Sequence, residues 1–231
     1  MNRTSVSFDI SRGNWGNQHI FPDMLYIDTN SIIDIFEQRT HGQLIEDYLN
    51  ELIKRDGMII WSQHTIDEII DFVHYDYYAK LAKQKNIKRS QKAAPYKIVE
   101  NTVTDAESSE IAEKVMIKVD TIQEYLEQFG SQVVQEEREV NELARSIYIG
   151  HGNNRKDCKH VAAANLEGTN NILTQDSGFL RFPNMNVYGS SLALVNGYKT
   201  IQGPSGYIDL SQTFASKQEM IDEEDEQDTA I

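Results

Sequence analysis

The sequence lacks the features of several large protein classes. Its single cysteine, Cys158, excludes an internal disulfide bond and a cysteine-rich zinc site, which fits a reducing compartment. No apolar run is long enough to span a membrane, and the amino terminus lacks the charged and then apolar pattern of a signal peptide. No repeat or break in composition divides the 231 residues. These absences predict a soluble cytoplasmic protein without a membrane partner, with residues 1–215 forming one domain.

Positive charge is also scarce. A net charge of −14 argues against binding a polyanion over the whole surface, because each phosphate contact normally draws on Lys or Arg. The charge is uneven, since residues 222–228 carry six acids and no base, and we interpret residues 216–231 as a disordered acidic tail. A segment of opposite charge, Lys80 to Lys97, holds seven bases and no acid. It is either a solvated flexible connection or an electrostatic guide for nucleic acid, with Lys85, Lys88, Arg89 and Lys92 as candidate contacts.

Two short apolar runs lead to an aspartate. Met24–Ile27 has the composition of a buried strand and is followed by Asp28, and the run from Asn171 through Thr174 leads to Asp176. In open α/β sheets the carboxyl ends of the strands line the crevice where ligands bind, so both aspartates are candidates for chemistry. The alternative for each is a residue that only begins a turn.

Two further acids lie near the starts of predicted helices. The helix from about Thr65 to Lys85 carries Glu68 on the side opposite an apolar stripe, where periodicity alone predicts a surface carboxylate. Aromatic neighbours on that side leave open that it is covered. A helix beginning at Arg155 carries Asp157, whose alternative role is to balance the helix dipole.

The remaining elements follow from apolar spacing and turn residues. The pattern predicts, in chain order, a possible edge strand within residues 1–23, helices over 31–38 and 43–55, a strand over 58–61, helices over 104–129 and 133–149, a strand over 185–188 and an edge hairpin over 195–210. Strands that alternate with helices predict an α/β fold with a central, mainly parallel sheet.

In such a sheet the four acids could converge on one side. Four unpaired carboxylates would repel one another, so a divalent cation is their natural partner, and oxygen ligands favour Mg²⁺ or Mn²⁺ over zinc. Three histidines, His64, His151 and His160, lack the close ligand spacing of a zinc site, and we interpret them as surface or packing residues.

Four segments, taken in order, resemble PIN-domain nucleases. They are Tyr26–Asn30, Thr65–Ile69, Asp157–Ala164 and Ile172–Phe179. The resemblance covers residues 24–84 and 155–188 and implies a PIN-like three-layer sandwich with a helical insertion over about 85–150. It implies an acidic quartet with two polar groups near it. The quartet is Asp28, Glu68, Asp157 and Asp176, and the polar groups are Asn30 and Thr174.

The resemblance also implies an activity. Members of the family hydrolyse phosphodiester bonds, most often in RNA, with a divalent metal ion, and Asp28 and Asp157 are the expected direct ligands. Glu68 would ligate the metal or orient water, and Asp176 would act directly or through water. An inhibitory protein partner, an antitoxin, stays possible.

Two alternatives compete with this function. A non-catalytic PIN-like module that binds RNA or protein would be favoured if a quartet residue were missing, and none is. A haloacid-dehalogenase-like phosphatase needs a second acid two residues after the first, where this chain has Asn30. RNA or DNA as the substrate, the biological role and the oligomeric state stay open.

Overall fold

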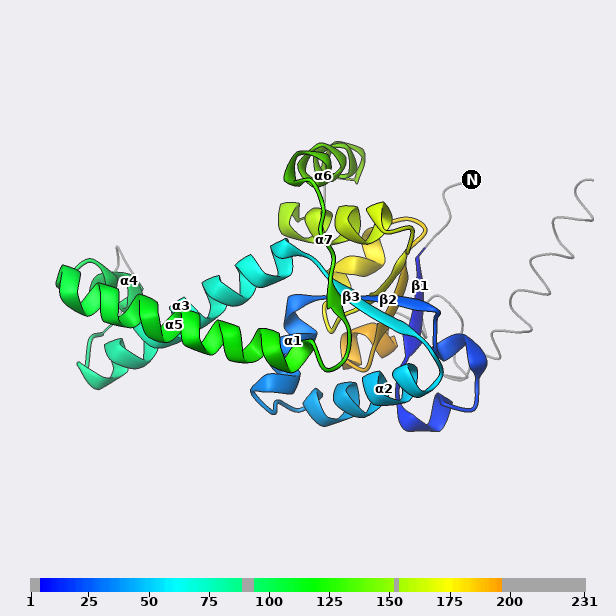
Figure 1. Ribbon diagram of the computed structural model, residues 1–231, viewed down its shortest axis with the longest axis horizontal. Helices are drawn as coiled ribbons and strands as arrows, with labels where there is room; N and C mark the ends of the chain where they lie inside the picture. Colours follow the sequence, from blue (N-terminus) through cyan, green and yellow to red (C-terminus); the bar gives the residue numbers. More distant parts are fainter. Residues whose placement is uncertain (1–4, 89–93, 152–153, 197–231) are drawn as a thin grey trace, which may run out of the picture.

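A computed structural model describes residues 5–88, 94–151 and 154–196, and its centre is one six-stranded sheet (Figure 1). The strand order is β1-β6-β5-β2-β3-β4, and every pair of neighbouring strands is parallel. The strands are β1 (Val6–Asp9), β2 (Met24–Ile27), β3 (Met58–Trp61), β4 (Ser131–Gln132), β5 (Asn171–Leu173) and β6 (Asn186–Gly189). This arrangement confirms the predicted α/β class.

Seven α-helices connect or cover the strands. They are α1 (Thr29–Phe36), α2 (Gly42–Lys54), α3 (Gln63–Gln84), α4 (Pro95–Glu100), α5 (Asp105–Leu126), α6 (Glu137–His151) and α7 (Arg155–Leu166) within the described residues. Three short 3₁₀ helices lie at Arg12–Asn14, Gln18–Ile20 and Ser177–Arg181. In the part of the chain that the structure describes, no helix has the length and apolar character needed to cross a membrane.

Alternate strand residues point to opposite faces of the sheet, and helices cover both faces, so both sets of side chains are buried. On β2, Leu25 and Ile27 join a core formed with α1, α2, α3 and α5, whereas Tyr26 joins a second core formed with α6 and α7. Figure 1 shows α1 and α2 on one side of the sheet and α6 and α7 on the other. Full burial of each large apolar side chain is worth about 1.5–3 kcal/mol, so both layers hold the sheet.

The insertion over 85–150 adds helices and one strand. Helices α3, α4 and α5 form an arm that extends away from the sheet, with a small apolar core of its own near α4 (Figure 1). The Thr104 hydroxyl accepts a hydrogen bond from the Glu107 amide, and the Glu107 carboxylate accepts one from the Thr104 amide, which caps α5 as the sequence indicates. After α5, the chain returns to the sheet as β4, which pairs with β3.

Three details of this region differ from the sequence-based prediction. Helix α4 begins at Pro95, inside the segment interpreted as a flexible connection, because the missing N–H of proline is tolerated in the first turn. The strand β4 was not expected, since two polar residues carry no apolar period. Helix α6 begins at Glu137, four residues later than predicted, because the chain first crosses from β4.

Several sequence-based predictions lie outside the described residues. They concern the acidic tail over 216–231, most of the hairpin over 195–210, and two of the candidate nucleic-acid contacts, Arg89 and Lys92. The amino-terminal edge strand is present as β1, which pairs in parallel with β6.

Candidate active site

Asp28 lies where β2 ends and α1 begins. Its backbone is extended, and its amide donates a hydrogen bond to the Leu173 carbonyl of β5, which fixes it at the carboxyl edge of the sheet. The side chain is buried and does not cap α1. Instead, Oδ2 accepts a hydrogen bond of 2.8 Å from the Thr174 hydroxyl. The carboxylate is therefore held in the interior by Thr174, as a buried polar group requires.

His160 on α7 is the positive centre of the site. Its Nε2 atom lies 2.8 Å from Glu68 Oε2 and 3.3 Å from Asp28 Oδ1, and its Nδ1 atom lies 3.0 Å from the Tyr26 hydroxyl. Burial alone would lower the pKa of His160, but Tyr26, the hydrogen bond to Glu68 and the charge of Asp28 outweigh burial and raise it to about 10. His160 is thus an imidazolium at neutral pH, and it joins two carboxylates.

Glu68 projects from the second turn of α3 toward α7. Besides His160, its Oε2 atom accepts a hydrogen bond of 2.8 Å from the Thr29 hydroxyl, and Lys156 Nζ lies 3.3 Å from Oε1. Burial opposes ionisation of Glu68, but the hydrogen bonds and charge of His160, together with Thr29, lower its pKa to about 2. The side of α3 opposite the apolar stripe is therefore covered by α7, and Glu68 is not a surface carboxylate.

Asp157 and Asp176 lie together around Gly178. A Cβ atom built on Gly178 would come within 3.1 Å of Asp176 Oδ1, which is a tight contact, and 3.4 Å of Asp157 Oδ2, which is an ordinary one. The Asp176 carboxylate accepts a hydrogen bond from the Gly178 amide, and its own amide donates to the Thr174 hydroxyl. Thr174 thus links Asp176 to Asp28.

The electrostatics of Asp157 show that all four acids interact. Burial raises the pKa of Asp157 to about 6, with further contributions from the negative charges of Asp176, Asp28 and Glu68, while His160 opposes them. Burial also raises the pKa of Asp28 above its usual range. His160 therefore balances the Asp28 and Glu68 side of the site but leaves Asp157 in an excess of negative charge. A divalent cation would relieve that excess, and carboxylate oxygens are suitable ligands for it.

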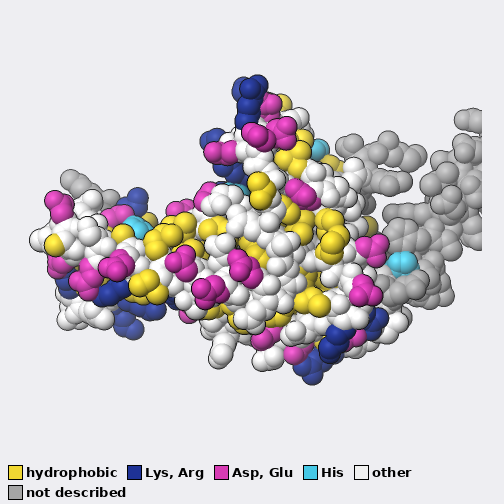
Figure 2. Space-filling view, in the orientation of Figure 1, with side chains coloured by type: hydrophobic (Ala, Val, Ile, Leu, Met, Phe, Trp, Pro, Cys, Tyr) yellow, Lys and Arg dark blue, Asp and Glu magenta, His cyan; other side chains and the backbone are white. Residues whose placement is uncertain are grey.

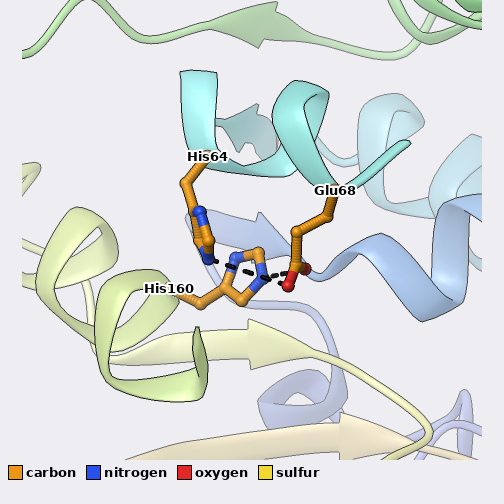
Figure 3. Close-up of side chains that lie close together, drawn as sticks. All are labelled: His64, Glu68 and His160. Carbon is orange, nitrogen blue, oxygen red and sulfur yellow. Dashed lines mark hydrogen bonds and ion pairs between the residues drawn. The ribbon is translucent and has the colours of Figure 1, made fainter. Parts of the chain in front are cut away.

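A second group of possible ligands adjoins the acids. One side-chain atom of each of His64, Glu68 and His160 lies within 4.8 Å of the other two (Figure 3). While His160 is protonated, only Glu68 and the ring of His64 have electron pairs for a metal ion. The His64 Nε2 atom is buried 3.8 Å from Glu68 Oε1, and among the described residues it has no hydrogen-bond partner. Burial and the charge of His160 lower the pKa of His64 to about 4, so its imidazole is neutral at pH 7.

His64 and His160 contact carboxylates, and their interpretation as only surface or packing residues is wrong. Helical spacing places His160 on the same face of α7 as Asp157, and His64 four residues before Glu68 on α3. Those spacings were the available signal, but only the packing of α3 against α7 brings the two rings together, with centroids 4.6 Å apart.

The other predicted site residues within the described ranges are exposed. Asn30 is exposed in the first turn of α1. Lys85 and Lys88 are exposed beyond the end of α3, and Lys85 lies 4.0 Å from Glu107 of α5. At 1.5 Å per residue, Lys85 is roughly 25 Å from Glu68 along the helix axis. A role for these residues stays a prediction.

Carboxylates that converge at the carboxyl edge of a parallel sheet define an α/β protein with an acidic, candidate metal-binding site. The family model for the PIN domain matches residues 25–184, and the chain belongs to the PIN-domain family. No curated protein matches the sequence. Among solved structures, the chain is similar to one described as the crystal structure of FitAcB from Neisseria gonorrhoeae, with 16% sequence identity, 71% of this chain and 96% of that chain covered, and a TM-score of 0.38. That likeness is too low to carry an argument.

Replacement of Asp157 by Asn should stabilise the protein in the presence of a chelator. The pKa of Asp157 is raised from 3.8 to about 6 in the folded protein. Ionisation of Asp157 therefore costs the folded protein stability: the cost is absent below pH 3.8 and is complete once the pH has risen through 6. After allowance for solvent screening, Asp157→Asn should raise the free energy of unfolding by about 1–2 kcal/mol at pH 8 and by little near pH 3.5. Denaturant unfolding at both pH values measures the difference, and an equal change at both would contradict the charge repulsion.

Proposed function

We propose that this protein is a divalent-metal-dependent endonuclease that hydrolyses phosphodiester bonds, preferentially in RNA. The observation that carries the proposal is the convergence of Asp28, Glu68, Asp157 and Asp176, which come from four separate segments and interact electrostatically. Membership of the PIN-domain family supports the nuclease class.

In this proposal Asp28, Asp157 and Asp176 hold the metal ion. When bound, a divalent cation supplies a Lewis acid that lowers the pKa of water and offsets charge on the phosphate. Thr174 orients Asp28 through its hydrogen bond and positions the Asp176 backbone through another. Glu68 is fixed by His160 and Thr29 and orients the attacking water. Lys156, which lies beside Glu68 and is half exposed, is available to contact a phosphate oxygen.

The donor set bears on the choice of metal. Carboxylates alone accept both Mg²⁺ and Mn²⁺, whereas imidazole nitrogen suits Mn²⁺ better than Mg²⁺. The neutral His64 ring has a buried nitrogen without a hydrogen bond beside Glu68. The three aspartates therefore allow activity with both ions, and Mn²⁺ should bind more tightly than Mg²⁺ only where the His64 nitrogen joins them as a ligand.

The test uses the purified full chain with end-labelled single-stranded RNA and DNA of one sequence. Each substrate is incubated with Mg²⁺, with Mn²⁺ or with a chelator. The proposal expects internal cleavage with either metal, faster on RNA, and none with the chelator. Cleavage that survives the chelator, or stable binding without cleavage in every metal condition, would overturn it. The second result would favour the non-catalytic RNA-binding module.

An inhibitory protein partner stays a prediction. An acidic protein that cleaves RNA would need control in the cell that makes it, and a partner that covers the four acids would provide it. Purification of the chain from its native source under mild conditions would test this, since an active preparation that elutes at the size of the chain alone would contradict it.

A further inference from the structure

A groove lies between α6 and α7. The two helices pack side by side, and the groove has a volume of about 690 Å³. It is lined by basic residues from both helices, together with an aromatic ring and one acid. These are Arg138, Arg145, Tyr148 and Glu142 of α6, and Arg155 and Lys159 of α7. Lys and Arg side chains are visible on the projection at the top of Figure 2, where Figure 1 places α6.

The positive charges of the groove are largely uncompensated. Glu142 pairs with Arg138 at 2.8 Å. Across residues 5–88, 94–151 and 154–196, no carboxylate forms an ion pair with Arg145, Arg155 or Lys159. In a chain with a net charge of −14, three unpaired bases on one groove give a local surface suited to an anion. The two arginines of α6 are seven residues apart, so they share a face and lie roughly 10 Å apart along it.

The groove adjoins the acidic site through α7. Arg155 and Lys159 are four residues apart and line the groove. Their next neighbours, Lys156 and His160, are about 100° further round the helix and contact Glu68. An extended anion in the groove would therefore pass from one face of α7 to the next and reach the four acids.

The aromatic ring distinguishes the kind of polyanion. Tyr148 lines the groove and is 47% exposed, so its ring is available for stacking. Stacking requires an unpaired base, and every base has a face that can stack. A duplex keeps its bases stacked on one another and would contact only the arginines.

We propose that the α6–α7 groove binds single-stranded nucleic acid and leads the strand to the acidic site. The arginines and the lysine of the groove hold phosphates, and Tyr148 stacks on a nucleobase. The inference rests on the proposed nuclease function, which supplies the reason for a strand at the four acids. It places the binding surface on the insertion helix α6 and on α7, and not on the basic segment Lys80 to Lys97 at the other end of α3.

The test measures binding without cleavage. Fluorescence anisotropy with labelled single-stranded RNA and DNA oligonucleotides is recorded in a chelator over a range of salt concentrations. The double variant Arg138→Glu, Arg145→Glu should raise Kd by at least about tenfold and reduce the slope of log K against log salt by about 1.4, for two lost phosphate contacts. Tyr148→Ala should raise Kd for single strands by about tenfold and leave the salt slope unchanged.

The matched control is the double variant Lys85→Glu, Lys88→Glu, which makes the same change in net charge on the arm. Its Kd should stay within about twofold of the wild-type value at physiological salt. Circular dichroism and thermal unfolding establish that every variant is folded. An equal loss in the control and the groove variant, unchanged binding in the groove variant, or no binding of single strands by the wild-type chain would overturn the inference.

The outcome separates this inference from the nuclease proposal. Binding that depends on the groove residues, without cleavage in the presence of any metal, would support the groove as a nucleic-acid site and refute the proposed nuclease activity. If the wild-type chain cleaves with metal and the groove variants bind and cleave equally well, the nuclease activity is supported and the groove is refuted as the binding site.

Discussion

Asp28→Asn is expected to reduce metal-dependent cleavage at least about a thousandfold while the protein stays folded. Asp28 is the most buried of the four acids, and it is anchored at the carboxyl end of β2 by the backbone bond to Leu173. Asparagine keeps the size and the hydrogen bond with Thr174 but removes the negative charge that would hold a cation. The loss should therefore lie in metal binding and turnover and not in the fold.

The matched control for this variant is Asp67→Asn. Asp67 is an exposed acid of α3 that contacts Gln63 and points away from Glu68, so the same chemical change there should alter cleavage by less than about twofold. Titration of Mn²⁺ by calorimetry gives a readout that does not depend on activity. Full cleavage by Asp28→Asn, or Mn²⁺ binding equal to that of the wild-type chain, would refute the assigned site.

The elements that sequence analysis predicted well are those whose signal is local. Met24–Ile27 and Met58–Trp61 are short apolar runs between polar turns, and both are strands with the predicted bounds. The start of α5 was predicted because the capping box of Thr104 and Glu107 needs only four consecutive residues. Because strand ends and helix starts position the acids, the pattern alone predicted that all four could lie on one side of the sheet.

What the sequence did not reveal depends on packing between distant segments. Glu68 and His160 are 92 residues apart, and no spacing rule joins a helix before the insertion to one after it. The basic groove is hidden for the same reason, since its residues are scattered over α6 and α7 among acids such as Glu142. By contrast, Lys80 to Lys97 is conspicuous because its seven bases lie in one short segment without an acid, although α3 carries Lys85 away from the site.

His160→Gln is expected to lower the free energy of unfolding by about 3–5 kcal/mol at pH 6 in a chelator, because it removes the positive charge that contacts both Asp28 and Glu68. Glutamine is close to histidine in size, so little of the loss would come from a cavity. His64→Gln is the matched control, since His64 lies in the same cluster but is neutral and its Nε2 atom has no hydrogen bond. It should cost less than about 1 kcal/mol.

The pH dependence identifies the charge of His160 as the cause. The pKa of His160 is raised from 6.5 to about 10 in the folded protein. Its stabilising contribution is therefore fully present below pH 6.5 and is lost as the pH rises through 10. The difference in stability between the wild-type chain and His160→Gln should shrink over that range, as measured by denaturant unfolding at pH 6, 8 and 9.5. A difference that stays constant would show that His160 acts through packing alone.

A divalent cation should partly replace the lost imidazolium. In His160→Gln the two carboxylates face each other without a positive charge, so a bound cation relieves more repulsion there than in the wild-type protein. Addition of Mn²⁺ should therefore raise the melting temperature of His160→Gln by more than that of the wild-type chain, and that of His64→Gln by less, if His64 is a ligand. Equal shifts in all three proteins would place the cation outside the cluster of His64, Glu68 and His160. A shift that is largest in His160→Gln, intermediate in the wild-type chain and smallest in His64→Gln would show that the cation binds at the residues that hold the folded site together.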